Sequence, residues 1–176
     1  NIQFGNATAN PMYYSHNFYI NNQEIKDLVI PNSVDTINNY AFSGCSGLTT
    51  LNYNAENCTN MGYLVFNGCS NLTTLYIGES VKIIPNSAFS GCTGLKDVAI
   101  GNGVTEIGSY AFSGCIEIKE ITIPNNTTFI GSNAFYNCES LRTVTIGSAV
   151  TEVGEYAFDG CRFRSVLSFL HLKWCS

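Results

Sequence analysis

Charge is scarce in this 176-residue chain, because Asp, Glu, Lys and Arg together make up only 12% of it. Eight Lys and Arg stand against 13 Asp and Glu, which gives a formal net charge of −5 at neutral pH. So small a basic content argues against a nucleic-acid or anionic-membrane partner. Long apolar runs are also missing, since no stretch of the sequence reaches the roughly 18 residues of a membrane-spanning helix.

A five-residue phrase of the type Ala-Phe-x-Gly-Cys recurs along the chain. Its cysteines are spaced 24, 23, 23, 23 and 23 residues apart, at Cys45, Cys69, Cys92, Cys115, Cys138 and Cys161. A fixed period of this size predicts a solenoid, in which each repeat stacks only on its neighbours. Equivalent side chains then form columns with about 4.8 Å between neighbours. Such parallel side chains rarely have the dihedral angle of a disulfide, so we predict six buried free thiols. Cys58 is expected in the core and Cys175 on the surface.

Within one repeat the apolar residues alternate in a way that predicts two extended segments. The strand positions lie six and eight residues after each cysteine, and a Gly, Pro or Asn then ends the strand. A second apolar pair follows, such as Val104 with Ile107, before another corner at Gly108. The Ala-Phe-x-Gly-Cys phrase then predicts a tight helical or 3₁₀ turn.

The two ends depart from the repeat. Residues 1–21 are predicted to form a degenerate N-terminal cap or half-repeat that buries Tyr14, Phe18 and Tyr19. Residues 22–169 hold the repeats, with Leu167 and Phe169 in the strand positions of the last one. For residues 170–176 two interpretations stay open, a hydrophobic cap or a non-native tail.

The pattern Cys-x-x-Leu-x-x-Leu/Val/Ile-x-Ile-Pro/Gly-x-x-Val-x-x-Ile-Gly-x-x-Ala-Phe-x-Gly resembles the BspA-like, or Treponema pallidum-type, leucine-rich repeats. Residues 95–115 follow it at nearly every position, and the resemblance covers about residues 22–169. It implies a leucine-rich repeat solenoid, a curved right-handed coil with a parallel sheet on the concave face and short extended or 3₁₀ segments on the convex face. It also implies a secreted or cell-surface protein that adheres to host matrix proteins, host receptors or neighbouring cells.

Residues that point away from the core on the predicted strands form columns from repeat to repeat. A cationic column with Lys96, Lys119 and Arg142 runs beside an acidic one with Asp97 and Glu120. A third column contains Asn52 and Tyr76. These seven residues are the candidate ligand-binding site, with Tyr76 as an aromatic anchor. The alternative is that the charged pairs only keep the sheet soluble.

An enzyme is not expected, nor is a cofactor or a metal site. The two histidines, His16 and His171, lie at opposite ends of the predicted rod, and the cysteines occupy core positions. The main expectation is therefore a protein-binding module that adheres through the concave face. Two alternatives stay open: a spacer that projects another domain, and self-association through the open ends of the sheet.

Overall fold

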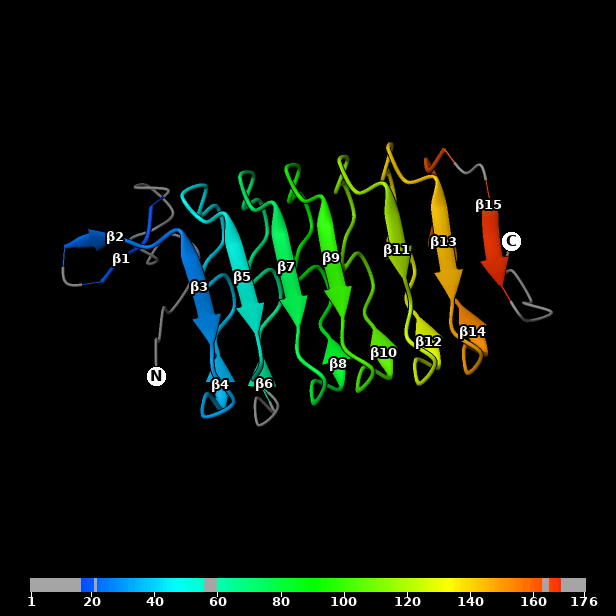
Figure 1. The fold of residues 1–176 in the computed structure, drawn as a ribbon, viewed down its shortest axis with the longest axis horizontal. Helices are drawn as coiled ribbons and strands as arrows, with labels where there is room; N and C mark the ends of the chain where they lie inside the picture. Colours follow the sequence, from blue (N-terminus) through cyan, green and yellow to red (C-terminus); the bar gives the residue numbers. More distant parts are fainter. Residues whose placement is uncertain (1–16, 21, 56–59, 163–164, 169–176) are drawn as a thin grey trace.

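The computed structural model describes residues 17–20, 22–55, 60–162 and 165–168, and it is a parallel β-solenoid (Figure 1). No helix occurs among these residues. Each turn of the solenoid, or rung, contributes one long and one short strand. The long strands form the main sheet: β3 (Asp27–Ile30), β5 (Thr50–Tyr53), β7 (Thr74–Ile77), β9 (Asp97–Ile100), β11 (Glu120–Thr122), β13 (Thr143–Ile146) and β15 (Ser165–Ser168). The short strands form the second sheet: β4 (Thr36–Ile37), β6 (Asn60–Met61), β8 (Ile83–Ile84), β10 (Glu106–Ile107), β12 (Phe129–Ile130) and β14 (Glu152–Val153).

Equivalent residues of successive repeats lie side by side, as the period predicts. Leu51 pairs in parallel with Leu75, and Leu75 with Val98. The inward strand residues Leu51 and Leu75 are fully buried. Because no repeat covers its own apolar face, each rung completes its core on the next one. The predicted solenoid is therefore confirmed.

Phenylalanine side chains form a continuous stack through the core. Six rings, from Phe42 to Phe158, lie nearly parallel with centroids 5.1–5.6 Å apart. Phe18 continues this column at the N-terminal end, but its ring is turned edge-on to Phe42 at 85° and 5.5 Å. Phe18 precedes a small antiparallel hairpin of β1 (Tyr19–Ile20) and β2 (Gln23–Glu24). Phe18 is partly buried against the first repeat, as expected, but Tyr19 is 53% exposed, so its predicted burial is wrong; Tyr14 lies outside the described residues.

The six repeat cysteines form the predicted column of free thiols; five of them are buried as predicted, whereas Cys161 is only partly buried. Each thiol from Cys69 onward donates a hydrogen bond to a phenylalanine carbonyl of the preceding rung; for example, the Cys115 Sγ–O distance to Phe89 is 3.2 Å. Burial raises the pKa of the Cys45 and Cys115 thiols to about 12. Cys58 and Cys175 lie outside the described residues, so their placement stays a prediction.

The Ala-Phe-x-Gly-Cys phrase forms successive β-turns, and the predicted helical or 3₁₀ turn is wrong. Ala41 N–H donates to the Asn38 carbonyl, and Cys45 N–H to the Phe42 carbonyl. The third residue of each turn has a positive φ, 60° at Tyr40 and 73° at Gly44, which interrupts any helical path. The glycine of the phrase supplies this left-handed conformation, and Asn137 takes its place in one repeat with a φ of 55°.

Prolines coincide with a break in each sheet. The main sheet divides into β3-β5-β7-β9 and β11-β13-β15, and the second sheet into β4-β6 and β8-β10-β12-β14. Gly101 N–H donates to the Ile77 carbonyl of the previous rung, and Gly108 N–H to Ile84. Pro124 and Pro85 occupy the same two positions of other repeats and have no N–H to donate. Figure 1 shows wider intervals at both breaks, between β9 and β11 and between β6 and β8.

The last rung differs from the expected register. Val166, not Leu167, pairs with Val144, and Ser168 pairs with Ile146. The prediction placed Leu167 there by counting from Cys161, but the connection from Cys161 to the strand is one residue shorter than in the preceding repeat. Phe169 and residues 170–176 lie outside the described part of the chain.

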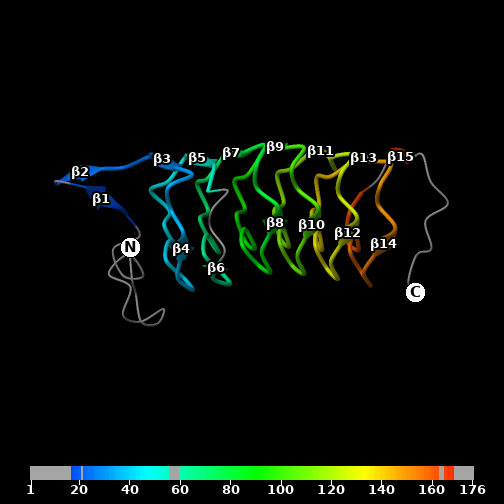
Figure 2. The same ribbon diagram turned by 90° about the horizontal axis from the view of Figure 1, so that it is seen from below.

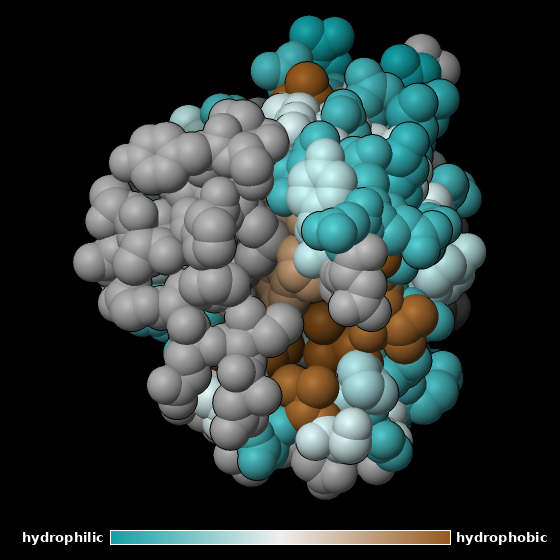
Figure 3. Space-filling model, turned by 90° about the vertical axis from the view of Figure 1, so that its left-hand side faces the viewer, coloured by the Kyte–Doolittle hydropathy of each residue, from teal (hydrophilic) through white to brown (hydrophobic). Residues whose placement is uncertain are grey.

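The two ends and the long sides of the stack present different surfaces. Viewed from below, the main strands follow one side of a nearly straight stack, so the concave curvature of that side stays a prediction (Figure 2). Figure 3 looks onto the N-terminal end, where apolar residues reach the surface between polar neighbours. In the first rung, Val29 is exposed and Val34 is only partly buried.

Candidate protein-binding face

The outward side of the main sheet, here called the main face, carries an apolar column across four strands. Val29 pairs with Asn52, Asn52 with Tyr76, and Tyr76 with Ala99. Their neighbours along each strand point into the core, because successive side chains of a strand face opposite ways. Val29 is 58% exposed and Tyr76 49% exposed, so both present apolar area to solvent. Two of the seven predicted site residues, Asn52 and Tyr76, therefore lie side by side.

The predicted charged columns lie next to this apolar column. Asp27, Thr50, Thr74 and Asp97 are paired in register across β3, β5, β7 and β9. One residue earlier, Lys96 N–H donates to the Thr73 carbonyl, and Thr73 N–H to Thr49. The hydroxyl groups of Thr49 and Thr73 also donate to backbone carbonyls of the previous rung, which fixes these short side chains. Lys96 and Asp97 are exposed at the end of this ladder.

The break at Pro124 divides the predicted site into two groups. Asn52, Tyr76, Lys96 and Asp97 belong to the ladder that ends with β9. The remaining three residues belong to the ladder that begins with β11: Lys119, Glu120 and Arg142. In this second group Arg142 N–H donates to the Lys119 carbonyl at 2.9 Å, and Glu120 pairs with Thr143. The structure therefore forms two shorter columns instead of one continuous face.

The break has a local effect on burial. At the two inward positions of β9, Val98 and Ile100 are only partly buried, whereas Ile121 and Ile123 of the next rung are almost completely buried. Val98 and Ile100, on the last strand before the break, thus leave apolar area accessible that other rungs cover. This area lies at the junction of the two groups of predicted residues.

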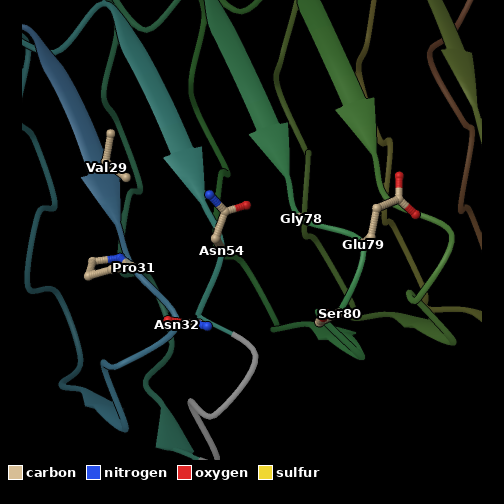
Figure 4. Close-up of a pocket in the computed structure, with 7 residues that line it drawn as sticks. All are labelled: Val29, Pro31, Asn32, Asn54, Gly78, Glu79 and Ser80. Carbon is tan, nitrogen blue, oxygen red and sulfur yellow. The ribbon is translucent and has the colours of Figure 1, made fainter.

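A hollow of about 340 Å³ lies where the strands β3, β5 and β7 end. Val29 and Pro31 line one side, and Asn54 and Glu79 the other (Figure 4). Figure 4 shows the Glu79 carboxylate extending toward the end of β9, and its Oε2 accepts a hydrogen bond from Asn102 N–H at 2.7 Å. The hollow continues the apolar surface of Val29 to the lower edge of the main face.

The arrangement offers little for covalent or metal chemistry. The raised pKa of the Cys45 and Cys115 thiols keeps them protonated, so these two lack the nucleophilic thiolate form near neutral pH. The partly buried Cys161 differs, because a hydrogen bond with Cys138 lowers its pKa. Among residues 17–20, 22–55, 60–162 and 165–168, no group of three or more His, Cys, Asp or Glu side chains is placed to hold a metal ion. In the same part of the chain, no helix has the length and apolarity needed to cross a membrane.

The family profile of the BspA type leucine rich repeat region matches residues 14–138 and 105–169, with six copies. The chain belongs to this family. The resemblance inferred from the Ala-Phe-x-Gly-Cys phrase is therefore confirmed. No curated protein matches the chain.

Several solved structures of leucine-rich repeat proteins share this fold. A leucine-rich repeat protein from Bacteroides ovatus has 28% identity and a TM-score of 0.73 over 77% of this chain and 35% of its own. A leucine rich cell surface protein from Faecalibacterium prausnitzii has 29% identity and a TM-score of 0.68, over 82% of this chain and 44% of its own. The leucine-rich repeat protein of T. pallidum is 22% identical with a TM-score of 0.64, over 81% of this chain and 72% of its own. The chain thus spans less than half the length of the first two proteins.

Sequence reasoning identified the outward columns of this BspA-type chain but missed their division. The missed features are the breaks, the partly exposed Val98 and Ile100, and the hollows near Pro31 and Pro85. A signal for them was present, because Pro85 and Pro124 replace glycines whose N–H groups join other rungs.

Proposed function

We propose that this BspA-type leucine-rich repeat chain is part of a secreted or cell-surface protein that binds another protein through its main face. The relatives provide the general support, since leucine-rich repeat solenoids are binding scaffolds and one similar structure is called a cell surface protein. The observation that carries the proposal is the half-exposed Tyr76 at the centre of a column flanked by exposed charges. Tyrosine is enriched at the energetic centres of protein interfaces.

The remaining residues fit the surroundings of such an anchor. Asn52 and Ala99, the neighbours of Tyr76 in register, are short and leave its ring accessible. The exposed charged residues are of both signs. The basic ones are Lys96, Lys119 and Arg142, and the acidic ones are Asp97 and Glu120. Charges of both signs at a rim favour specificity and encounter rate more than affinity. A ligand such as a host matrix protein or a surface receptor, bound for adhesion, is the partner that we propose.

Binding to immobilised fibronectin and a small panel of matrix proteins tests this proposal, after the purified chain has been shown to be monomeric. We expect saturable binding that Tyr76→Ala weakens by about tenfold or more, the effect of a central aromatic contact. The double variant Lys96→Glu/Lys119→Glu should mainly slow association and reduce its salt dependence. Tyr156→Ala is the matched control, because Tyr156 is 63% exposed but follows the second sheet.

Two other outcomes separate the alternatives. Binding that survives the Tyr76 and lysine variants would place the ligand elsewhere on the solenoid. A folded monomer without a ligand in the panel favours a spacer, and the greater length of the related proteins is consistent with that role.

A further inference from the structure

A second hollow, of about 230 Å³, lies on the second sheet and is separate from the main face. Met61, Tyr63, Ile83, Ile84 and Pro85 provide an apolar lining, and Glu106 lies at its wall. Ile83 and Tyr63 are each 49% exposed. Half-exposed aliphatic, aromatic and methionine side chains gathered in one depression are typical of interaction sites.

The hollow exists because the second sheet is broken at this point. Gly62, Gly108, Gly131 and Gly154 donate backbone N–H groups to the rung before them, to Ile37, Ile84, Ile107 and Ile130 respectively. Pro85 takes the equivalent position directly after β8, and no ladder joins β8 to β6. The hollow lies at this interval, so a single backbone feature accounts for its position.

The volume of this hollow limits which ligands can occupy it. Small-molecule sites usually have about 300–1,000 Å³, and this hollow is smaller and lies at the surface. One large apolar side chain fits a volume of this size better than a cofactor does. Tyr63 N–H is held by Asn39 Oδ1 at 3.1 Å, and the Tyr63 ring meets Tyr40 edge-on at 5.2 Å, which fixes one wall in advance.

The charged residues beside the hollow indicate which group should flank the apolar side chain of a ligand. The strands of the second sheet carry two charged residues, and both are acidic: Glu106 and Glu152. They lie in the same outward column, with Phe129 between them. Lys82 is exposed just before β8, outside this column. A cationic group that lies beside an apolar one would therefore meet an acidic, apolar surface at Glu106 and Ile83.

We propose that this hollow is a docking site for a short segment of a partner protein, with an aliphatic or aromatic side chain in the hollow and a Lys or Arg against Glu106. The site is independent of the proposed main-face ligand. A partner can then bind on each of the two sheets of the same solenoid (Figure 2).

A phage-displayed library of random linear peptides, selected against the intact chain, tests the proposal. We expect enrichment of peptides with a large apolar residue next to Lys or Arg, followed by fluorescence polarisation with a labelled copy of one such peptide. Ile83→Asp should weaken this peptide by about tenfold or more, because it removes half-exposed apolar area at the centre of the site. Ile116→Asp is the matched control, since Ile116 is 37% exposed and follows the cysteine turn instead.

Charge reversal provides the decisive comparison. Selection against Glu106→Lys should enrich acidic residues beside the apolar anchor, whereas a merely sticky apolar patch would yield the same peptides for both proteins. The proposal is overturned if no such peptides are enriched, or if the selected peptide binds Ile83→Asp and Glu106→Lys as tightly as it binds the unchanged chain. Circular dichroism of each variant excludes unfolding as the cause of lost binding.

Discussion

The phenylalanine stack and the two sheets respond differently to the same irregularities in sequence. The six stacked rings from Phe42 to Phe158 continue through every rung, with interplanar angles of at most 18°. Each sheet, in contrast, is interrupted once, at Pro85 or at Pro124. The buried side chains therefore keep their register across the breaks, and pairing in both sheets at once is not needed at every rung.

The breaks fall at different rungs, which preserves the rod. Where Pro124 interrupts the main sheet, β10 and β12 of the second sheet remain paired. Where Pro85 interrupts the second sheet, β5 and β7 of the main sheet remain paired. Each interval thus keeps one ladder and the phenylalanine contact, so neither break produces a hinge through the whole cross-section.

Phe112→Ala should have the largest effect, because it removes a fully buried ring from the middle of the stack. We expect a loss of about 3–5 kcal/mol in the free energy of unfolding, the usual cost of truncating a core phenylalanine. Urea denaturation measures it. Phe158→Ala, at the end of the stack and 6% exposed, is the control and should cost less. Equal losses at both positions would contradict the inference that the phenylalanine stack keeps the rungs in register.

Gly108→Ala should come next, because it disturbs a regular rung. A Cβ at Gly108 would lie 2.6 Å from Asn86 Oδ1 and 2.7 Å from Asn86 N, so the rungs must move apart. We expect a loss of about 1–3 kcal/mol, as for overpacking in a core. Gly91→Ala is the comparison: its Cβ would have ordinary contacts, but alanine would be strained at a φ of 71°. If Gly108→Ala were neutral in urea denaturation, the rung spacing would be more tolerant than we infer.

The sequence predicted the buried core of the solenoid well, and it predicted the turns and the sheet breaks poorly. Positions buried in most repeats, such as those of Phe112, Cys115 and Ile118, recur in the sequence, so their columns were predictable. The turn conformation was not, because its left-handed residue is Tyr40 in one repeat and Ser87 in another, and the residue type alone does not indicate a positive φ. The division of the candidate site does not follow from strand-ending residues alone, because Gly and Pro both end a strand but only Gly keeps the N–H that joins the rungs.

The buried, protonated thiol of Cys115 should make stability fall at alkaline pH. Burial raises the pKa of Cys115 from 9.0 to about 12, so the unfolded chain releases this proton first. The contribution is complete below pH 9 and is lost as the pH rises from 9 toward 12, by about 1.4 kcal/mol at pH 10. Cys115→Ala should therefore lose about 1.4 kcal/mol less unfolding free energy than the unchanged chain between pH 7 and pH 10. An unchanged slope, measured by urea denaturation between pH 7 and pH 10, would mean that Cys115 is not protected from ionisation.

Pro124→Ala should have the smallest effect on stability and be the most specific test of the breaks. The new residue has an N–H opposite the Ile100 carbonyl, in the position from which Asn54 N–H donates to Ile30 at 2.9 Å. Asn54 also carries a Cβ, so the missing N–H of proline is the relevant difference. The hydrogen bond adds about 0.5–1.5 kcal/mol to the free energy of unfolding, and the more flexible unfolded chain removes about 0.4–1 kcal/mol, so the net change is small.

Hydrogen exchange of the amide that Pro124→Ala introduces therefore decides the question. Slow exchange, together with better burial of Val98 and Ile100, means that one missing donor divides the main sheet. Rapid exchange in a folded variant would assign the break to side chains of β9 and β11 instead.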